Sequence, residues 1–486
     1  MPASPSTARA INDRLALRLL QQQGPLTATQ LKQLTGLSRP TVADLVERLT
    51  AAGLIAVVGE SGEQRRGPNA KLYGIVADRA HLAALDVRTE SVAVLVADLV
   101  GHVLAEASVP IDGGTGTGPA VDQAVGLVER VAKEAGADRL HTVGIGAPGL
   151  IDPVGGQLRD SAKLPAWHRR LAAALQERFP RARVDIENET NLAARAEQRD
   201  GAARDRDTFV LLWLDLGVGA AVVLDGRLRR GASGGAGEVG FLPVPGTSGL
   251  PSATDCAGGF HSLAAAAAVT ELATAHGWTP PAAAAGGRGV GPVPDPVEGE
   301  GVPRAADREH GPVEHPDAAV VHGRAVSSGS DGVGGPSAPA PAADVVGGRG
   351  AAPVGEPVHG AAVPPAAGAV RAAGLVREAV RAEGAHPAAG RFLDALADRL
   401  AVGAAAVVSV LDPGCVVLAG EVGRAGGDAL AARVQARLAR MSPLVTEVRA
   451  GALGGGAVLR GALLTARDTA QDELFGPPDR SQGTVG

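Results

Sequence analysis

The chain has 486 residues, enough for about three domains, and only 2% of its residues are aromatic, which excludes an aromatic core. Its two cysteines, Cys256 and Cys415, exclude a disulfide framework and favour a reducing compartment. The net charge of −6 gives no sign of nucleic acid, but residues 1–75 carry nine Lys and Arg against five Asp and Glu, a local charge of +4. Without a signal-peptide pattern or a long apolar run, we expect a cytoplasmic protein with no membrane partner.

The chain begins with a pattern of short amphipathic helices. Leucines at helical spacing predict a helix over residues 8–22, and Gly24-Pro25 ends it. A second helix is expected over residues 27–36, with Thr27 as its cap. The leucines expected to face the core from these two helices are Leu15, Leu19, Leu20, Leu31 and Leu34.

A third helix and a hairpin complete this N-terminal pattern. Ser38 can cap a helix over residues 38–53, with Pro40 in the first turn, where a missing N–H costs nothing. Two β-prone runs, residues 54–58 and 71–76, then flank a polar tip. Two short helices joined by a Gly-containing turn and followed by such a wing predict a winged helix-turn-helix domain over residues 1–77. The residues expected to bury the third helix are Val42, Leu45, Val46 and Leu49.

The docking geometry of this motif predicts which residues contact DNA. The N-terminal end of the recognition helix enters the major groove, and a basic wing meets phosphate or the minor groove. We therefore expect contacts with double-stranded operator DNA from Thr27, Ser38, Arg39, Pro40, Thr41, Arg65, Arg66 and Gly67. The alternative is a small basic helical module that binds another protein, but the arginines at the first turn and at the wing tip favour DNA.

From residue 78 onward, apolar strands alternate with helices, which predicts an α/β class. Residues 81–87 and 91–107 are expected to pair as a hairpin. A second hairpin is expected within residues 209–224, with Gly217 and Gly219 in its turn. The repeated hairpin predicts two related lobes with a cleft between them.

Several stretches of this region resemble the ROK family, which contains sugar kinases and sugar-responsive repressors. They are "VGIGAPGLID", "VDIENETNLAARAE", "LDLGVGAAVVLDGRLRRGASGGAGEVG" and "LDPGCVVLAGEVGRAGG…ALGGGAVLRGAL", in family order. The resemblance covers residues 1–280 and about 368–466. It implies a two-lobed, actin-like sugar-kinase fold, with a first lobe over 78–204 and a second lobe over 205–280 and 367–470. The winged helix-turn-helix ahead of it marks the repressor branch, because the kinases lack one.

The resemblance also implies that the first hairpin has lost its nucleotide function. In the kinases of this family, an Asp-x-Gly-x-Thr hairpin holds ATP phosphates on backbone N–H groups. Here Asp86 is present, but Arg88 and Glu90 replace the glycine and the threonine, and a carboxylate at this turn repels phosphate. Glu189 stands where the catalytic Asp should be. We therefore expect no catalytic residue, no enzyme activity and no cofactor.

A sugar site is implied by the same resemblance, in an incomplete form. Carboxylate and amide groups together satisfy several sugar hydroxyls. The implied sugar-binding residues are Asn188, Glu189 and Glu238, with Lys163 and His168 near the cleft. Two interpretations stay open: these residues bind a sugar with changed geometry, or they are inherited polar residues in a cleft without a ligand.

A structural zinc site of the family is not expected in this chain. Phe241 replaces the family's histidine ligand, and of the Cys loop only Cys256 remains, with His261 nearby. One cysteine and one displaced histidine fall short of the four ligands that a structural zinc needs, so we expect no metal.

Residues 281–366 have the composition of a disordered insertion. This segment contains 17 Gly and 14 Pro and no Leu, Ile, Met or aromatic residue, so it cannot bury enough apolar surface to offset its ordering entropy. A disordered tail is expected over residues 471–486.

Together these features predict a DNA-binding transcriptional repressor whose degenerate kinase-like domain senses a sugar or a related small molecule. A homodimer or homotetramer is expected, because one recognition helix reads too few bases for useful specificity. The alternatives are a sugar kinase with a fused DNA-binding domain and a ligand-independent DNA-binding regulator.

Overall fold

The computed structural model describes residues 5–61, 69–159, 164–247, 249–252, 257–280 and 367–475. Four sequence predictions fall outside these residues: the wing tip with Arg65, Arg66 and Gly67, the position of Lys163, the loop cysteine Cys256 and the insertion over 281–366.

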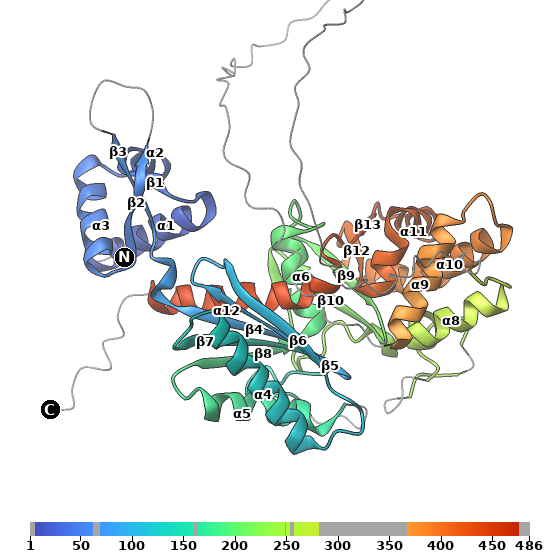
Figure 1. The fold of residues 1–486 in the computed structure, drawn as a ribbon. Coiled ribbons are helices and arrows are strands. Elements are labelled where there is room, and N and C mark those ends of the chain that lie inside the picture. Colours follow the sequence, from blue (N-terminus) through green and yellow to red (C-terminus); the bar gives the residue numbers. More distant parts are fainter. Residues whose placement is uncertain are drawn as a thin grey trace, which may run out of the picture. The chain divides into compact units, whose positions relative to one another are not determined.

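The N-terminal domain has the predicted three helices and two wing strands (Figure 1). Its elements are α1 (Pro5–Gln23), β1 (Leu26–Thr27), α2 (Ala28–Thr35), α3 (Arg39–Ala51), β2 (Ile55–Ser61) and β3 (Ala70–Ile75). The strands form an antiparallel sheet in the order β1-β3-β2. The two-residue strand β1 was not predicted, because so short a segment has no readable periodicity.

The core of this domain confirms the predicted face of α3 but corrects those of α1 and α2. Val42, Leu45, Val46 and Leu49 are all buried. In α1 the buried stripe is Ala16, Leu17 and Leu20, while Leu15 is 39% exposed. In the eight-residue α2 only Leu31 is buried, and Leu34 is 44% exposed. The prediction left out the small residue Ala16, which is buried. It also left out Leu37, which follows α2 in the chain and packs against the core.

The first lobe is built on a five-stranded sheet with the order β6-β5-β4-β7-β8. Strands β4, β5 and β6 pair antiparallel, and β4, β7 and β8 pair parallel. After the short 3₁₀ helix η1 (Ala77–Arg79), the elements are β4 (His81–Arg88), β5 (Ser91–Asp98), β6 (Val103–Pro110), α4 (Thr117–Glu134), β7 (Leu140–Ala147), α5 (Ala166–Arg178), β8 (Arg183–Asn188) and α6 (Glu189–Asp200).

The second lobe repeats this topology strand for strand. Its sheet has the order β11-β10-β9-β12-β13, again with an antiparallel hairpin half and a parallel half. The elements are β9 (Phe209–Leu214), β10 (Val218–Leu224), β11 (Arg227–Arg229), η2 (Val239–Phe241), α7 (His261–Ala264), α8 (Ala266–Ala275), α9 (Ala367–Arg381), α10 (Pro387–Leu411), β12 (Cys415–Ala419), α11 (Gly420–Met441), β13 (Glu447–Ala450), η3 (Gly454–Gly456) and α12 (Ala457–Leu474). The predicted repeat of the hairpin is confirmed: β4–β5 and β9–β10 occupy corresponding positions.

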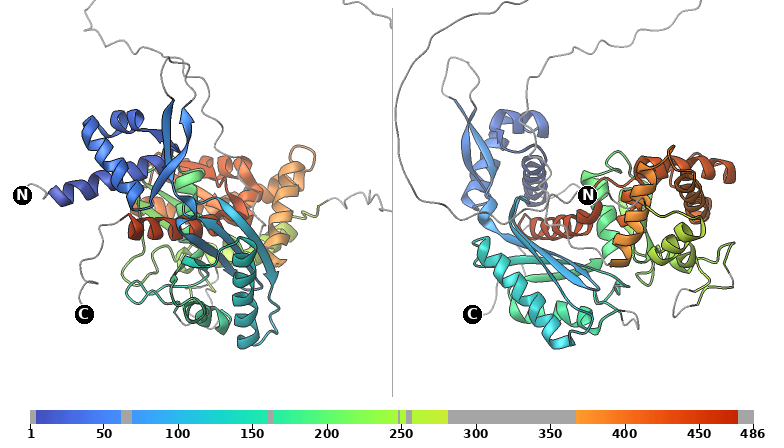
Figure 2. Two further views of the ribbon diagram at one scale, coloured as in Figure 1. Left: turned by 60° about the vertical axis from the view of Figure 1, so that its left-hand side comes forward. Right: turned by 45° about the vertical axis from the view of Figure 1, so that its right-hand side comes forward.

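Helices α6 and α12 pack against each other between the two sheets (Figures 1 and 2). Helix α12 lies on β4 and β7, whereas α6 also contacts β9 and β10. Helices α4 and α5 cover the other face of the first sheet, and α11 packs on β9 and β13 of the second. The close approach of α6 and α12 requires a glycine: a Cβ at Gly461 would lie 2.0 Å from the carbonyl oxygen of Leu192.

A fully buried carboxylate joins α6 to the segment before α12. Glu197 accepts hydrogen bonds from the backbone N–H groups of Ala202 (2.7 Å), Ala452 (3.1 Å) and Leu453 (2.9 Å). A buried carboxylate without such donors would be strongly unfavourable. Glu197 therefore connects two segments that lie about half the chain apart.

The C-terminal boundary differs from the prediction. Helix α12 continues to Leu474, and Phe475 is buried, so the first residues of the expected tail belong to the fold. Gln471 explains part of this order, because its side chain donates a hydrogen bond to the carbonyl of Leu99. Among the helices of the described residues, none is long and apolar enough to cross a membrane.

Candidate functional site

The N-terminal end of α3 is exposed and capped as predicted. Ser38 has extended backbone, its hydroxyl accepts from the backbone N–H of Thr41 at 3.4 Å, and the two hydroxyls lie 2.8 Å apart. Ser38, Arg39 and Pro40 are exposed and Thr41 is half-buried. The first turn of the helix therefore offers two hydroxyls and a guanidinium to the outside.

Thr27 lies at the N-terminal cap of α2, as predicted. Its side chain is buried, and its hydroxyl accepts from the backbone N–H of Gln30 at 3.2 Å. The Gln30 side chain accepts in return from the backbone N–H of Thr27, which completes a capping box for α2. The structure thus confirms the predicted cap, while the DNA contact of Thr27 stays a prediction.

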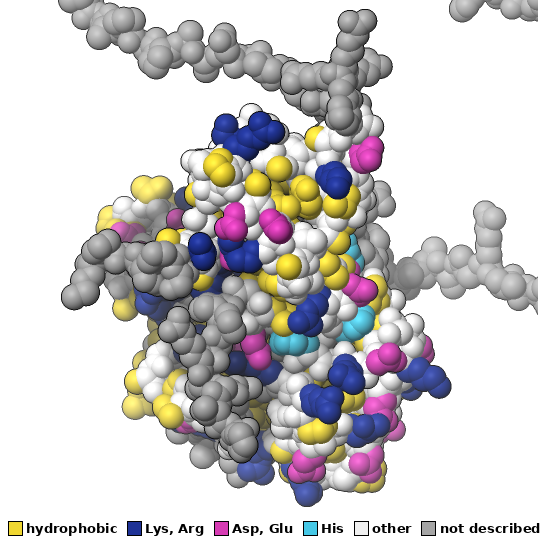
Figure 3. Space-filling view, turned by 90° about the vertical axis from the view of Figure 1, so that its left-hand side faces the viewer, with side chains coloured by type: hydrophobic (Ala, Val, Ile, Leu, Met, Phe, Trp, Pro, Cys, Tyr) yellow, Lys and Arg dark blue, Asp and Glu magenta, His cyan; other side chains and the backbone are white. Residues whose placement is uncertain are grey.

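An ion pair between Arg48 and Asp13, which the sequence did not reveal, joins α3 to α1. The Nε of Arg48 donates to Asp13 at 3.1 Å and a terminal nitrogen donates to its other oxygen at 2.5 Å, a bidentate contact between residues 35 positions apart. Arg48 also pairs with Asp44 on its own helix. In a view from the side of the N-terminal domain, Lys and Arg side chains stand among Asp, Glu and hydrophobic side chains (Figure 3). Because charge on this visible face is mixed, the placement of α3 matters more than bulk charge.

In the first lobe, the hairpin β4–β5 carries a buried ion pair at its turn. Asp86 is buried, and the Nε of Arg88 donates to its carboxylate at 3.1 Å. A terminal nitrogen of Arg88 donates to the carbonyl oxygen of Gly455, 3.2 Å away in η3. Burial raises the pKa of Asp86, and the neighbouring Arg88 opposes that rise. The arginine that replaces the family's glycine therefore turns inward and neutralises Asp86.

The corresponding hairpin of the second lobe carries a second buried carboxylate. One oxygen of Asp215 accepts from the backbone N–H of Leu216 at 2.7 Å, and the other accepts from that of Glu421 at 3.2 Å. Asp215 is close enough to Asp86 and Arg88 to affect the pKa of each. The two hairpins thus bring Asp86, Arg88 and Asp215 close to one another.

Asn188, predicted to bind a sugar, already uses most of its hydrogen-bonding capacity. Its Oδ1 accepts from the backbone N–H groups of Thr190 (2.9 Å) and Asn191 (3.3 Å), which caps α6. Its Nδ2 donates to the carbonyl of Gly149 at 3.0 Å. Since an amide nitrogen carries two protons, one N–H remains for a ligand.

Glu189 follows in the first turn of α6 and faces the same group of charges. Burial raises the pKa of Glu189 to about 8, and the carboxylates of Asp86 and Asp215 add to this effect. Within the described part of the chain, its carboxyl makes no hydrogen bond to protein. A carboxyl with this pKa is mostly protonated at neutral pH, so it can donate a hydrogen bond as well as accept one.

Glu238, the third predicted sugar contact, is exposed at the start of η2. The preceding Gly237 has a φ of +95°, and a Cβ there would lie 1.9 Å from the carbonyl oxygen of Ala220, so only glycine fits. Glu238 raises the pKa of Glu189, so the two side chains lie near each other. Phe241, which replaces the family's histidine, is half-buried in the same short helix.

A further ion pair spans the two sheets and was missed by sequence reasoning. Arg230, just after β11, donates from its Nε to Glu187 on β8 at 2.6 Å. Glu187 also accepts from the side chain of Asn191 at 3.0 Å. No sequence signal links Arg230 to Glu187, because they lie 43 positions apart on different elements. Among the described residues, no group of three or more His, Cys, Asp and Glu is arranged to hold a metal ion.

His168, which the resemblance placed near the cleft, is buried beside Trp167 at a ring distance of 4.2 Å. Neither ring nitrogen has a well-aligned hydrogen-bond partner among the described residues. Burial lowers the pKa of His168 to about 4, so the imidazole is neutral at physiological pH. His168 therefore fills a core position at the base of α5.

These two shifted groups predict a pH dependence of stability. Raising the pH from 6 to 9 should lower the free energy of unfolding by a few kcal/mol. The folded chain keeps the proton of Glu189 up to a pH of about 8, whereas the unfolded chain has already released it, so the folded state loses this advantage as the pH rises. Between pH 6.5 and 4 His168 acts in the opposite direction, because the unfolded chain protonates it more readily, and this loss offsets the stability that Glu189 gains as the pH falls.

Urea unfolding at each pH measures both effects. In the variant Glu189→Gln the loss of stability above pH 6.5 should disappear and a loss toward pH 4 should become visible. The variant His168→Phe should keep the alkaline loss and should gain stability toward pH 4. If Glu189→Gln unfolds with the wild-type pH profile, this account of Glu189 is wrong.

Comparisons with known proteins agree with this architecture. Residues 82–275 match the sequence profile of the ROK family, and residues 11–67 match that of the MarR family. The chain is similar in fold to the crystal structure of a ROK family transcriptional regulator described as a homologue of the Escherichia coli MLC protein. That match has a TM-score of 0.63 at 17% sequence identity and covers 96% of this chain and 98% of the other.

Two curated relatives are repressors or regulators by name. The chain is 26% identical over 238 residues to the xylose repressor of Caldicellulosiruptor bescii, which covers 49% of this chain and 59% of that protein. It is also 26% identical over 244 residues to the DNA-binding transcriptional dual regulator NagC of Escherichia coli K12, which covers 49% of this chain and 58% of that protein. The matched region thus spans somewhat over half the length of these relatives. With its two matching profiles and its duplicated lobe topology, the chain carries a ROK family domain and, ahead of it, a MarR-like winged helix.

Proposed function

We propose that this chain is a DNA-binding transcriptional repressor whose ROK domain senses a neutral polyhydroxy ligand such as a sugar. The observation that carries the DNA-binding half is the exposed, capped first turn of α3, with Arg39 at its surface. Arg48, in the last turn, bonds the same helix to Asp13 of α1. Relatives that are named as repressors support the same function. Dimers or tetramers would place two such helices on an inverted repeat.

The cleft favours a sensing role over a kinase role. The guanidinium of Arg88 bonds to Asp86 and Gly455 at the hairpin where a kinase of this family needs open backbone N–H groups. Glu189 takes the place of the catalytic Asp that the resemblance implies and is one methylene longer. We therefore propose that the domain is not an enzyme, and robust release of ADP with any sugar substrate would overturn this.

The charges of the cleft also point to the class of ligand. Asp86, Asp215, Glu189, Glu238 and Glu421 all influence one another's pKa or that of Arg88. Among the described residues these five carboxyl groups outnumber the nearby arginines, which are Arg88 and, beside Glu421, Arg377 and Arg424. Carboxylates accept hydrogen bonds from hydroxyl groups and repel phosphate. An uncharged, hydroxyl-rich ligand therefore fits better than a phosphorylated one, with Glu189, Glu238 and the free N–H of Asn188 as its proposed contacts.

A binding titration of the full chain on the intergenic DNA beside its own gene tests the proposal at fixed salt, since salt alone shifts affinity strongly. The variant Arg39→Ala should weaken specific binding by about 1–3 kcal/mol, roughly 5- to 150-fold, because it removes a guanidinium from the groove-facing turn. The matched control Arg79→Ala changes an exposed arginine outside α3 and should bind as the wild type does. Equal binding by both variants would contradict the proposed role of α3.

The same titration, repeated with a panel of sugars, tests the sensing half. A sugar that releases the DNA should lose its effect in the variant Glu238→Gln. If the chain binds DNA but no sugar changes the affinity, the ligand-independent regulator becomes the better description.

A further inference from the structure

A basic pocket lies where α1 of the winged helix meets α6 and α12 of the ROK domain. It encloses about 270 Å³ and is lined by four arginines, Arg14, Arg18, Arg199 and Arg467, and by two aspartates, Asp468 and Asp472. Two positive charges on its wall are therefore unmatched. The residues belong to neither the α3 surface nor the interlobe cleft described above.

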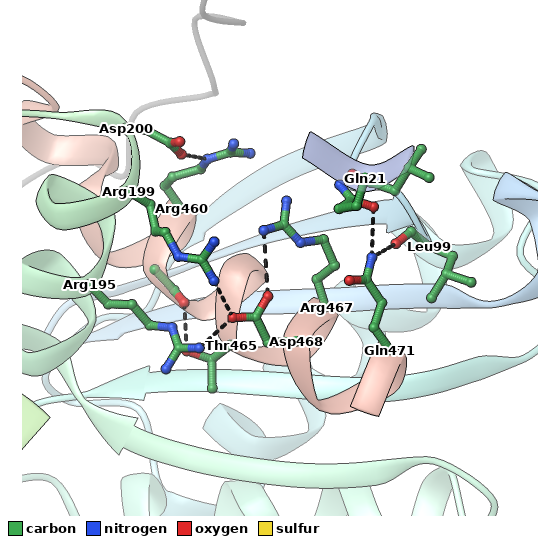
Figure 4. Close-up of polar contacts among 12 residues, drawn as sticks. Gln21, Leu99, Arg195, Arg199, Asp200, Arg460, Thr465, Arg467, Asp468 and Gln471 are labelled. Carbon is green, nitrogen blue, oxygen red and sulfur yellow. Dashed lines mark hydrogen bonds and ion pairs between the residues drawn. The ribbon is translucent and has the colours of Figure 1, made fainter. Parts of the chain in front are cut away.

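Arg467 on α12 is the buried member of this group. It is 9% exposed, and its Nε has no hydrogen-bond partner among the described residues. Its one ion pair is with the adjacent Asp468 at 3.5 Å, the outer limit of a hydrogen bond (Figure 4). Burial lowers the pKa of Arg467, and the nearby Arg199 and Arg460 lower it further. A buried guanidinium this poorly paired is unfavourable unless something else neutralises it.

The neighbouring acidic group is already shared. One oxygen of Asp468 accepts from Arg195 at 2.6 Å and from Arg199 at 2.8 Å, both on α6. Arg460 is paired with Asp200 at 2.7 Å (Figure 4). Asp468 thus serves three arginines, which leaves Arg467 without a carboxylate of its own.

Helix α1 contributes the opposite wall. Within the part of the chain that the structure describes, neither Arg14 nor Arg18 forms an ion pair or side-chain hydrogen bond. The wall is held in place by Gln21, whose Nε2 donates to the carbonyl of Val100 at 3.0 Å and whose Oε1 accepts from Gln471 at 2.8 Å (Figure 4). Two unpaired guanidinium groups on α1 therefore face a third on α12 across a small cavity.

We propose that this pocket is an anion site for a phosphate group, either inorganic phosphate or the monoester of a small metabolite. Guanidinium groups match phosphate oxygens in geometry, and a phosphate near neutral pH carries close to two negative charges, which balance the two unmatched positive ones. A single carboxylate would balance only one. The volume is slightly below the roughly 300 Å³ of the smallest common ligand pockets, which fits a phosphate with a small organic group. The bound anion would join α1 to α12.

The test is a titration of the full chain, without DNA, with inorganic phosphate, glucose 6-phosphate and glucose in a phosphate-free buffer at constant ionic strength. Calorimetry and thermal unfolding should show saturable binding and a raised Tm with phosphate, and neither effect with equivalent sodium chloride. A higher affinity for glucose 6-phosphate than for phosphate identifies a monoester site, and equal affinities identify a site for phosphate alone.

Variants locate the site. Arg467→Gln and, separately, Arg14→Gln should weaken phosphate binding about tenfold or more, because each removes a charge-assisted contact. The matched control Arg9→Gln makes the same change on an exposed residue of α1 and should bind phosphate as the wild type does. Absence of saturable phosphate binding, or unchanged affinity in both Arg467→Gln and Arg14→Gln, would overturn the proposal. Arg14 is only half-buried, so the Arg14→Gln variant still tests the site if Arg467→Gln folds poorly. No DNA is present in these titrations, so their outcome does not depend on the proposed repressor function.

Discussion

Replacing Arg88 by methionine should lower the free energy of unfolding by about 3–5 kcal/mol, one of the two largest effects expected in this chain. Methionine keeps the length of the side chain but removes its charge, so Asp86 is left buried and unpaired beside Asp215. The carbonyl of Gly455 also loses its donor from Arg88. Urea unfolding at pH 7, followed by circular dichroism, measures the change.

A double-mutant cycle separates the ion pair from simple packing. If the charge of Asp86 causes the loss, adding Asp86→Asn to Arg88→Met should recover much of the stability. The control Arg79→Met, at an exposed arginine ahead of β4, should change stability by less than about 0.5 kcal/mol. If Arg88→Met unfolds like the wild type, Asp86 does not need the positive charge of Arg88 for the stability of the fold, and this account is wrong.

The second large effect is expected at Glu197. The variant Glu197→Ala should lose at least about 3 kcal/mol, because three buried backbone N–H groups, those of Ala202, Ala452 and Leu453, lose their acceptor. It also leaves a cavity between α6 and the segment before α12. The same urea titration reports this change.

Two variants show whether hydrogen bonding is the cause. Glu197→Gln keeps the size of the side chain and one acceptor oxygen, so it should lose less stability than Glu197→Ala. Glu134→Ala, at an exposed glutamate near the end of α4, should have little effect. If Glu197→Gln is as unstable as Glu197→Ala, an acceptor oxygen alone is not enough. The three N–H groups then require the negative charge of the carboxylate.

Local patterns predicted the parts of the fold that depend on neighbouring residues. The caps at Thr27 and Ser38, the buried face of α3 and both hairpins follow from spacing and turn chemistry within a few residues. Leu34 shows the limit of this reading, because periodicity alone cannot tell how far an eight-residue helix reaches into a core.

Pairs that are distant in sequence could not be predicted. Arg88 bonds to Gly455 across 367 positions, and Arg230 to Glu187 across 43. The resemblance implied that Asn188 contacts a sugar, whereas its capping of α6 was seen only in the structure. The charges were visible in the sequence, whereas their partners depend on the way in which two sheets and the helices between them come together.

Helix α12 connects the two ends of the molecule's proposed signalling route. It has 18 residues, about 27 Å, and follows directly on η3, whose Gly455 is bonded to Arg88 in the cleft. Near its other end, Gln471 is bonded to Gln21 of the winged helix. The helix thus runs unbroken from the proposed ligand site to the N-terminal domain, so a tilt of its first turn would reach α1 without crossing a flexible joint.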